Sequence, residues 1–283
     1  STALMEDLYA HFPQLTAASR KLDTATLRRF AEENTIRTAT DAWKAGLVDG
    51  LRYDDEVKAE IRERAGLGKN ARINFVTLGQ YLKSMEDGKM SSDKVAVIYA
   101  QGDIVDGKGN EDNIASEDYR NLIRKVREDK SVKAVVFRIN SGGGSAMASE
   151  NIWRELSLTR KEKPVVVSFG DVAASGGYYV SCNADSIFAQ PNTITGSIGV
   201  FSILPNMQRF FNDKLGVTFD GVRTGPYADV NITRPLTSSQ KAWLQESVDS
   251  IYQTFKGRVA QGRHKEVSYI DSIGQGRVWS GIR

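Results

Sequence analysis

Residues 133–158 read KAVVFRINSGGGSAMASENIWRELSL, and this stretch decides the fold class. It opens with the apolar run 134–137, which predicts a buried β-strand. The glycine-rich turn 140–145 follows, and residues 147–158 have the composition of a helix. A strand that passes through a short turn into a helix is typical of α/β domains.

The same alternation extends to both sides of this stretch. Residues 95–99 and 164–168 are further apolar, β-rich runs. Two sets of apolar residues recur at helical spacing and predict one buried face each: Tyr119, Leu122, Ile123 and Val126 in the first helix, and Leu244, Val248, Ile251, Tyr252, Phe255 and Val259 in a long late helix. We therefore expect an α/β domain with a largely parallel sheet.

The rest of the chain predicts a helical segment at residues 1–64, a connector at 65–93 and the α/β unit at 94–283. The net charge of +3 leaves no electrostatic footprint for a nucleic acid. Cys182 is the single cysteine and cannot form an internal disulfide. No apolar run approaches the roughly 20 residues of a membrane helix. Because residues 1–30 carry charges throughout, we do not expect them to be a secretory leader. We expect neither a metal nor a cofactor.

Two turns have residues that suit chemistry. The glycines of residues 140–145 follow one strand, and Ser175 follows the next in a run of small residues, AASGGYY. Taken singly, the first could be a plain strand-to-helix turn and the second a cap or a packing choice. Consecutive parallel strands, however, end at the same edge of a sheet, where active sites form. Ser175 could then act as a nucleophile, with the glycine turn and the N–H of Gly176 as oxyanion donors.

We expect that the base that activates Ser175 is not a histidine. His11 lies beside Pro13 in the helical segment, and His264 lies in a charged stretch, so both are expected at the surface. A lysine made neutral by burial is the alternative. A phosphate-binding loop is excluded at residues 140–145, because Met147 stands where a glycine would be needed and no Gly-Lys-Ser/Thr follows.

Three segments together are similar to the signal peptide peptidase A family. Residues 140–145 resemble the family turn N-S-P-G-G-S, with Gly142 where proline is usual. Residues 173–179 resemble its nucleophile segment, and residues 195–200, TGSIGV, resemble the motif whose serine assists a lysine. The resemblance covers roughly residues 94–281 and is specific because the three motifs occur in family order. It implies a Clp/crotonase-like fold, a spiral of ββα units.

The resemblance also implies roles for single residues. Ser175 matches the nucleophile, and Gly144, with Gly143, matches the oxyanion turn. Ser197 matches the serine that hydrogen-bonds the lysine. An extended substrate is expected to pair with the backbone from Gly144 through Ser145 and Ala146 as an added strand.

One departure concerns the lysine itself. Single-unit members have it in a K-S-G-x-x-K-D-like segment, whose counterpart here is residues 223–229, with Tyr227 at the lysine position. Long-form members contain two tandem units, with the lysine in the first and the serine in the second. Residues 38–57 resemble the closing segment of a first unit. We therefore expect the lysine-bearing unit upstream of Ser1.

The resemblance thus implies a serine endopeptidase with a Ser–Lys dyad that degrades remnant signal peptides and other hydrophobic peptides. It implies an inner-membrane location with the catalytic part facing the periplasm, membrane attachment through a segment outside this chain, and a homo-oligomer, by resemblance a tetramer. Two alternatives remain open. A crotonase-like acyl-CoA enzyme would share the fold and the oxyanion hole, whereas a peptide-binding scaffold would need no lysine.

Overall fold

A computed structural model describes residues 2–84 and 91–283 of the chain. The chain divides into two compact units, Ser1–Ser92 and Asp93–Arg283. Residues 85–90, which belong to the expected connector, lie outside the described residues.

The first unit is helical, as the sequence predicts. Side-chain caps stabilise the starts of two of its helices. The Asp23 side chain accepts the Thr26 N–H at 2.7 Å, and Thr38 forms a capping box with Asp41. The last helix lies within the stretch expected to be a connector. The helices are α1 (Thr2–Arg20), α2 (Thr24–Glu32), α3 (Ala39–Lys44), α4 (Asp54–Arg64) and α5 (Leu78–Ser84).

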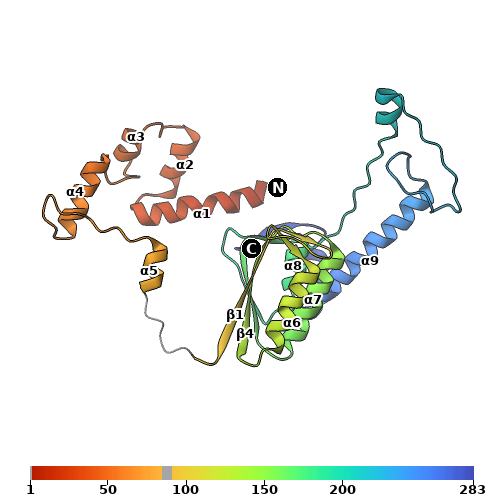
Figure 1. The fold of residues 1–283 in the computed structure, drawn as a ribbon. Helices are drawn as coiled ribbons and strands as arrows, with labels where there is room; N and C mark the ends of the chain where they lie inside the picture. Colours follow the sequence, from red (N-terminus) through yellow and green to blue (C-terminus); the bar gives the residue numbers. More distant parts are fainter. Residues whose placement is uncertain (1, 85–90) are drawn as a thin grey trace. The chain divides into compact units, whose positions relative to one another are not determined.

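The second unit is built on a six-stranded sheet in the order β1-β4-β5-β7-β8, with β6 also beside β5 (Figure 1). Every pairing is parallel except that of β7 with β8. This confirms the expected α/β class with a largely parallel sheet. The strands are β1 (Lys94–Gln101), β4 (Val132–Ser141), β5 (Val165–Ala174), β6 (Ser186–Phe188), β7 (Ile194–Gly196) and β8 (Val278–Ser280); β2 (Asp103–Val105) and β3 (Asn113–Ala115) form a separate parallel ladder.

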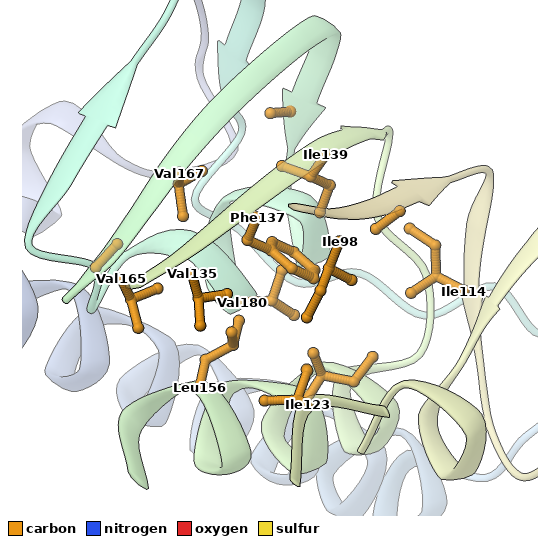
Figure 2. Packing of buried hydrophobic residues seen from close by; sticks show 14 of the residues in the cluster. Ile98, Ile114, Ile123, Val135, Phe137, Ile139, Leu156, Val165, Val167 and Val180 are labelled. Atoms are coloured by element: carbon orange, nitrogen blue, oxygen red, sulfur yellow. The ribbon is translucent and has the colours of Figure 1, made fainter. Parts of the chain in front are cut away.

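The helices of this unit cover one face of the sheet. Ile123, Leu156 and Val180 come from three different helices and pack against sheet residues such as Val135 and Phe137 (Figure 2). Burial of these apolar side chains is the main force that holds strand and helix layers together. The helices are α6 (Ser116–Glu128), α7 (Ala146–Arg160), α8 (Gly176–Ser181), α9 (Ser238–Arg263) and α10 (Val267–Ile273), with a short π-helical turn, η1 (Phe210–Lys214).

Two expected helix faces are only partly buried. On α6, Ile123 is fully buried but Leu122 is exposed. On α9, Phe255 and Val259 are buried, whereas Ile251 nearer the amino-terminal end is exposed. Figure 1 gives the reason, because the amino-terminal half of α9 extends away from the sheet together with the segment that precedes it. The sequence therefore predicts the helices and their period correctly, but it overestimates how much of each apolar face is buried.

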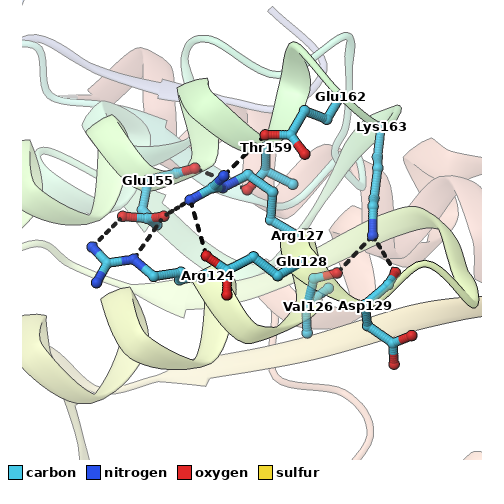
Figure 3. Close-up of polar contacts among 9 residues, drawn as sticks. All are labelled: Arg124, Val126, Arg127, Glu128, Asp129, Glu155, Thr159, Glu162 and Lys163. Atoms are coloured by element: carbon cyan, nitrogen blue, oxygen red, sulfur yellow. Dashed lines mark hydrogen bonds and ion pairs between the residues drawn. The ribbon is translucent and has the colours of Figure 1, made fainter.

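A buried ion network joins α6 to α7 (Figure 3). Glu155 of α7 is only 3% exposed and accepts hydrogen bonds from Arg124 at 3.1 Å and Arg127 at 2.9 Å. Burial opposes the charged form of Glu155, but the hydrogen bonds from both guanidinium groups outweigh it and lower its pKa. Arg127 also bonds the half-exposed Glu162 at 2.9 Å.

We expect Glu155→Gln to lower the free energy of unfolding by about 3 kcal/mol, because it removes the buried counter-charge of Arg127 and leaves this largely buried guanidinium paired with the half-exposed Glu162. Since the folded pKa of Glu155 is lowered, its contribution is complete above the unfolded pKa of about 4.3 and is lost as the pH falls through the folded value. Urea unfolding at several pH values measures both effects.

Glu162→Gln is the matched control, since Glu162 bonds the same arginine but is 51% exposed. It should cost less than about 1 kcal/mol. Equal and small losses in the two variants would show that the network does not stabilise the α6–α7 contact.

Candidate active site

Ser175 lies on a sharp turn between β5 and α8. Its backbone has φ 51° and ψ −120°, a conformation that non-glycine residues rarely adopt. Two hydrogen bonds fix it: the Ser175 N–H donates to the Gly196 carbonyl at 3.0 Å, and its carbonyl accepts the Tyr179 N–H at 2.8 Å. A strained strand-to-helix turn is the geometry by which many hydrolases present a nucleophilic hydroxyl.

The glycine turn after β4 packs directly against Ser175. A Cβ atom added at Gly143 would lie 2.8 Å from the Ser175 Cβ and 3.1 Å from its Oγ, and one added at Gly176 would lie 3.2 Å from the Gly144 nitrogen. Gly143 also has φ +109°, in the region that favours glycine. Only glycines allow the two turns to approach this closely, and the structure brings them together as the sequence predicts.

The amides at this junction differ in their availability. The Gly143 N–H donates to Ser141 Oγ at 3.1 Å, and Ile104 of β2 bonds the Gly143 carbonyl and the Ser145 N–H, both at 2.8 Å. In such a parallel bridge, Ile104↔Gly144, the N–H of Gly144 points away from the partner strand. Within residues 2–84 and 91–283, the N–H groups of Gly144 and Gly176 form no hydrogen bond.

The backbone expected to bind a substrate strand is partly used within the chain. The Ser145 N–H is bonded to Ile104, and Ser145 is the N-cap of α7, where its Oγ accepts the Ala148 N–H at 3.2 Å. The same hydroxyl donates to Asp106 at 2.7 Å, and Ala146 begins the helix. Of the three residues expected to pair with a substrate, Gly144 alone keeps both an exposed backbone and an unbonded N–H.

Ser197 follows β7 as Ser175 follows β5. β5 and β7 pair in parallel with Ala174 opposite Gly196, so Ser175 and Ser197 continue the same register at the ends of adjacent strands. Adjacent strands lie about 4.8 Å apart. Ser197 also has a positive φ, 47°, and its N–H donates to the Arg277 carbonyl at 2.8 Å. Two neighbouring non-glycine residues in strained conformations are a mark of a functional site.

No base is found next to these serines in the described part of the chain, where neither Oγ receives a hydrogen bond from a lysine or a histidine. His264 is the exposed C-cap of α9, and His11 lies on α1. Tyr227 packs against Trp243 of α9 with ring centroids 5.9 Å apart. Lys256 is buried, and its amine bonds Asp271 at 2.7 Å.

A polar cluster that joins side chains of α7, α8 and α9 was not predicted from the sequence. The Tyr179 hydroxyl bonds Glu150 of α7, and Glu150 forms an ion pair with Arg258 of α9. Arg258 also stacks 4.1 Å from the Trp153 ring centroid. Burial and the neighbouring Glu150 carboxylate raise the pKa of Tyr179, so its hydroxyl stays protonated. Glu150 and Arg258 are 108 residues apart, and no local pattern connects them.

Among the described residues no group of three or more histidine, cysteine or carboxylate side chains could hold a metal ion. Over the same residues, none of the helices combines the length and the apolar character needed to cross a bilayer.

Several known proteins are similar to this chain in sequence. Protease 4 of Salmonella typhi is 38% identical over 245 residues, which cover 86% of this chain and 39% of that protein. The chloroplastic serine protease SPPA of Arabidopsis thaliana is 37% identical, over 84% of this chain and 36% of that protein. A solved ClpP1 mutant of Listeria monocytogenes overlaps with a TM-score of 0.40 at 14% identity, covering 64% of this chain and 80% of that one.

The chain thus spans about two fifths of the length of these curated relatives. The model of Peptidase family S49 matches residues 157–283. Residues 157–283, which include both Ser175 and Ser197, therefore match peptidase family S49.

Proposed function

We propose that the second unit is the nucleophile-bearing part of a serine peptidase with a Ser–Lys dyad, whose lysine comes from an upstream unit. One observation supports this most directly. Ser175 and Ser197, both with a positive φ, stand at matching register positions at the ends of adjacent strands, and among the described residues the N–H groups of Gly144 and Gly176 at the Ser175 turn form no hydrogen bond. A plain structural turn would need neither the strain nor the unbonded amides.

In this proposal Ser175 Oγ attacks the substrate carbonyl carbon, and the proton of the hydroxyl passes to a neutral lysine. The N–H groups of Gly144 and Gly176 bind the oxyanion that develops on the carbonyl oxygen. Each such donor typically contributes about 10²- to 10³-fold to kcat. The Gly143 amide orients the turn through Ser141 instead of serving as a donor.

Ser197 hydrogen-bonds the lysine in this scheme. Its place beside Ser175 allows one amine to contact both hydroxyls. That amine must be largely desolvated, since its pKa has to fall from about 10.4 toward neutrality. Tyr227 is not a substitute for the lysine, because it packs on α9.

We further propose that the substrates are hydrophobic peptides, including remnant signal peptides, which pair with the backbone at Gly144. A relative from Enterococcus faecium, 33% identical over 205 residues, is named a putative signal peptide peptidase. The whole protein would act as a homo-oligomer at the periplasmic side of the bacterial inner membrane and attach through a segment outside this chain. The family resemblance supports these points.

Ser175→Ala, made in a protein that includes the proposed upstream unit, should reduce peptide hydrolysis by about a million-fold, the scale seen when a serine protease loses its nucleophile. It should also abolish labelling by a fluorophosphonate. Ser202→Ala, at an exposed serine of the same unit, is the control and should leave both rates unchanged. Near-normal hydrolysis by Ser175→Ala would refute the assignment.

The 283-residue chain alone should hydrolyse peptides at least about a hundredfold more slowly than the longer protein, because a general base contributes about 10²- to 10⁴-fold. Adding the upstream unit should restore the rate. Ser175-dependent hydrolysis by the chain alone would show that one of its own lysines is the base. Turnover of an acyl-CoA by the longer protein, without peptidase activity, would favour the crotonase-like alternative, and inactivity toward both would favour a scaffold.

A further inference from the structure

The conformation of Ser197 depends on a turn that is distant in sequence. The Ser197 N–H donates to the Arg277 carbonyl at 2.8 Å, and the Ile198 carbonyl accepts the Gly276 N–H at 2.9 Å. A Cβ added at Gly199 would lie 2.6 Å from the Gly276 Cα, so the two backbones are in direct contact. The turn at residues 274–277 therefore bonds the backbone at Ser197 and at the residue that follows it.

This turn is itself strained, and the side chain of Tyr252 bonds it. Gln275 has φ 59° and Gly276 has φ 71°, so two successive residues are left-handed. The Gln275 N–H donates to the hydroxyl of Tyr252, on α9, at 2.9 Å. A Cβ added at Gly274 would lie 3.0 Å from the same hydroxyl and 3.3 Å from the Ile198 carbonyl. The hydroxyl thus fills the space behind the turn.

The Tyr252 hydroxyl is oriented by an ion pair. It donates to Asp271 Oδ1 at 3.1 Å, and Lys256 Nζ bonds the same oxygen at 2.7 Å. Lys256 is only 6% exposed and lies 4.4 Å from the centroid of the Tyr252 ring. Because the carboxylate accepts the hydrogen bond from the hydroxyl group, a lone pair of the hydroxyl oxygen is directed at the Gln275 N–H.

We infer that Tyr252 is a positioning residue that acts through the 274–277 turn to set the conformation of Ser197. The inference rests on the proposed function for its catalytic consequence, but its structural part stands without it. Tyr252 does not touch the reacting atoms. Its hydroxyl determines where the hydroxyl of Ser197 stands relative to Ser175, and hence how the lysine is held.

The structural part is tested by hydrogen exchange in the 283-residue chain itself. Tyr252→Phe removes the hydroxyl and keeps the ring, so the amides of Ser197 and Gly276 should exchange roughly fivefold faster, the factor that one lost hydrogen bond gives. Tyr269→Phe, at a half-exposed tyrosine of α10, is the matched control and should change neither. Unchanged exchange in Tyr252→Phe would overturn the inference.

The catalytic part is tested by the rate of Ser175 acylation by a fluorophosphonate, in the protein with the upstream unit. Tyr252→Phe and Ser197→Ala should each slow acylation, by about tenfold for Tyr252→Phe. If Tyr252 acts through Ser197, the double variant will be no slower than Ser197→Ala alone. Additive slowing would overturn the inference, since a merely structural role predicts it.

The two proposals can fail separately. If Ser175→Ala still reacts with the fluorophosphonate, the proposed function is wrong, while the exchange result still decides whether Tyr252 holds Ser197. If labelling depends on Ser175 but Tyr252→Phe reacts at the normal rate, the proposed function stands and the inference about Tyr252 is wrong.

Discussion

The close approach of Gly143 to Ser175 is the constraint on which the second unit depends. No side chain fits between the two turns, and the strands that end there must arrive in a fixed register. That register includes an irregularity between Ile139 and Ser141, after which Ser141 pairs with Ala173. The buried residues beneath, such as Phe137 and Val167, hold β4 and β5 in this relation. The core thus does more than stabilise the fold, because it sets the distance between the hydroxyl and the amides.

Helix α9 connects parts of the site that are far apart in sequence. Arg258 reaches Glu150 and, through it, Tyr179 in the helix that follows Ser175. One and a half turns earlier on α9, Tyr252 contacts the turn that bonds the backbone at Ser197. Both serine turns therefore depend on one helix, and a shift of that helix would change the two together.

Much of this arrangement could be predicted from the sequence, since it follows from local patterns. The apolar runs and small-residue turns predicted the parallel sheet and the meeting of residues 140–145 with Ser175, because parallel strands end at one edge. Long-range polar contacts could not be predicted. Nothing near Tyr252 in the sequence indicates a hydrogen bond to Gln275. Likewise, nothing near Ser145 indicates that the Ile104 carbonyl accepts a hydrogen bond from its N–H. The exposed half of α9 was missed because periodicity reports a helix and its face, but not what covers that face.

The left-handed backbone at Ser175 and Ser197 has an evolutionary consequence. Each such residue costs about 1–3 kcal/mol of folding stability, which glycine would not incur. If selection acted on stability alone, both serines would therefore tend to be replaced by glycine. A lineage that lost the need for its chemistry should show this exchange early, at these two positions before others. Retention of serine at both would then record continued selection for the hydroxyl groups.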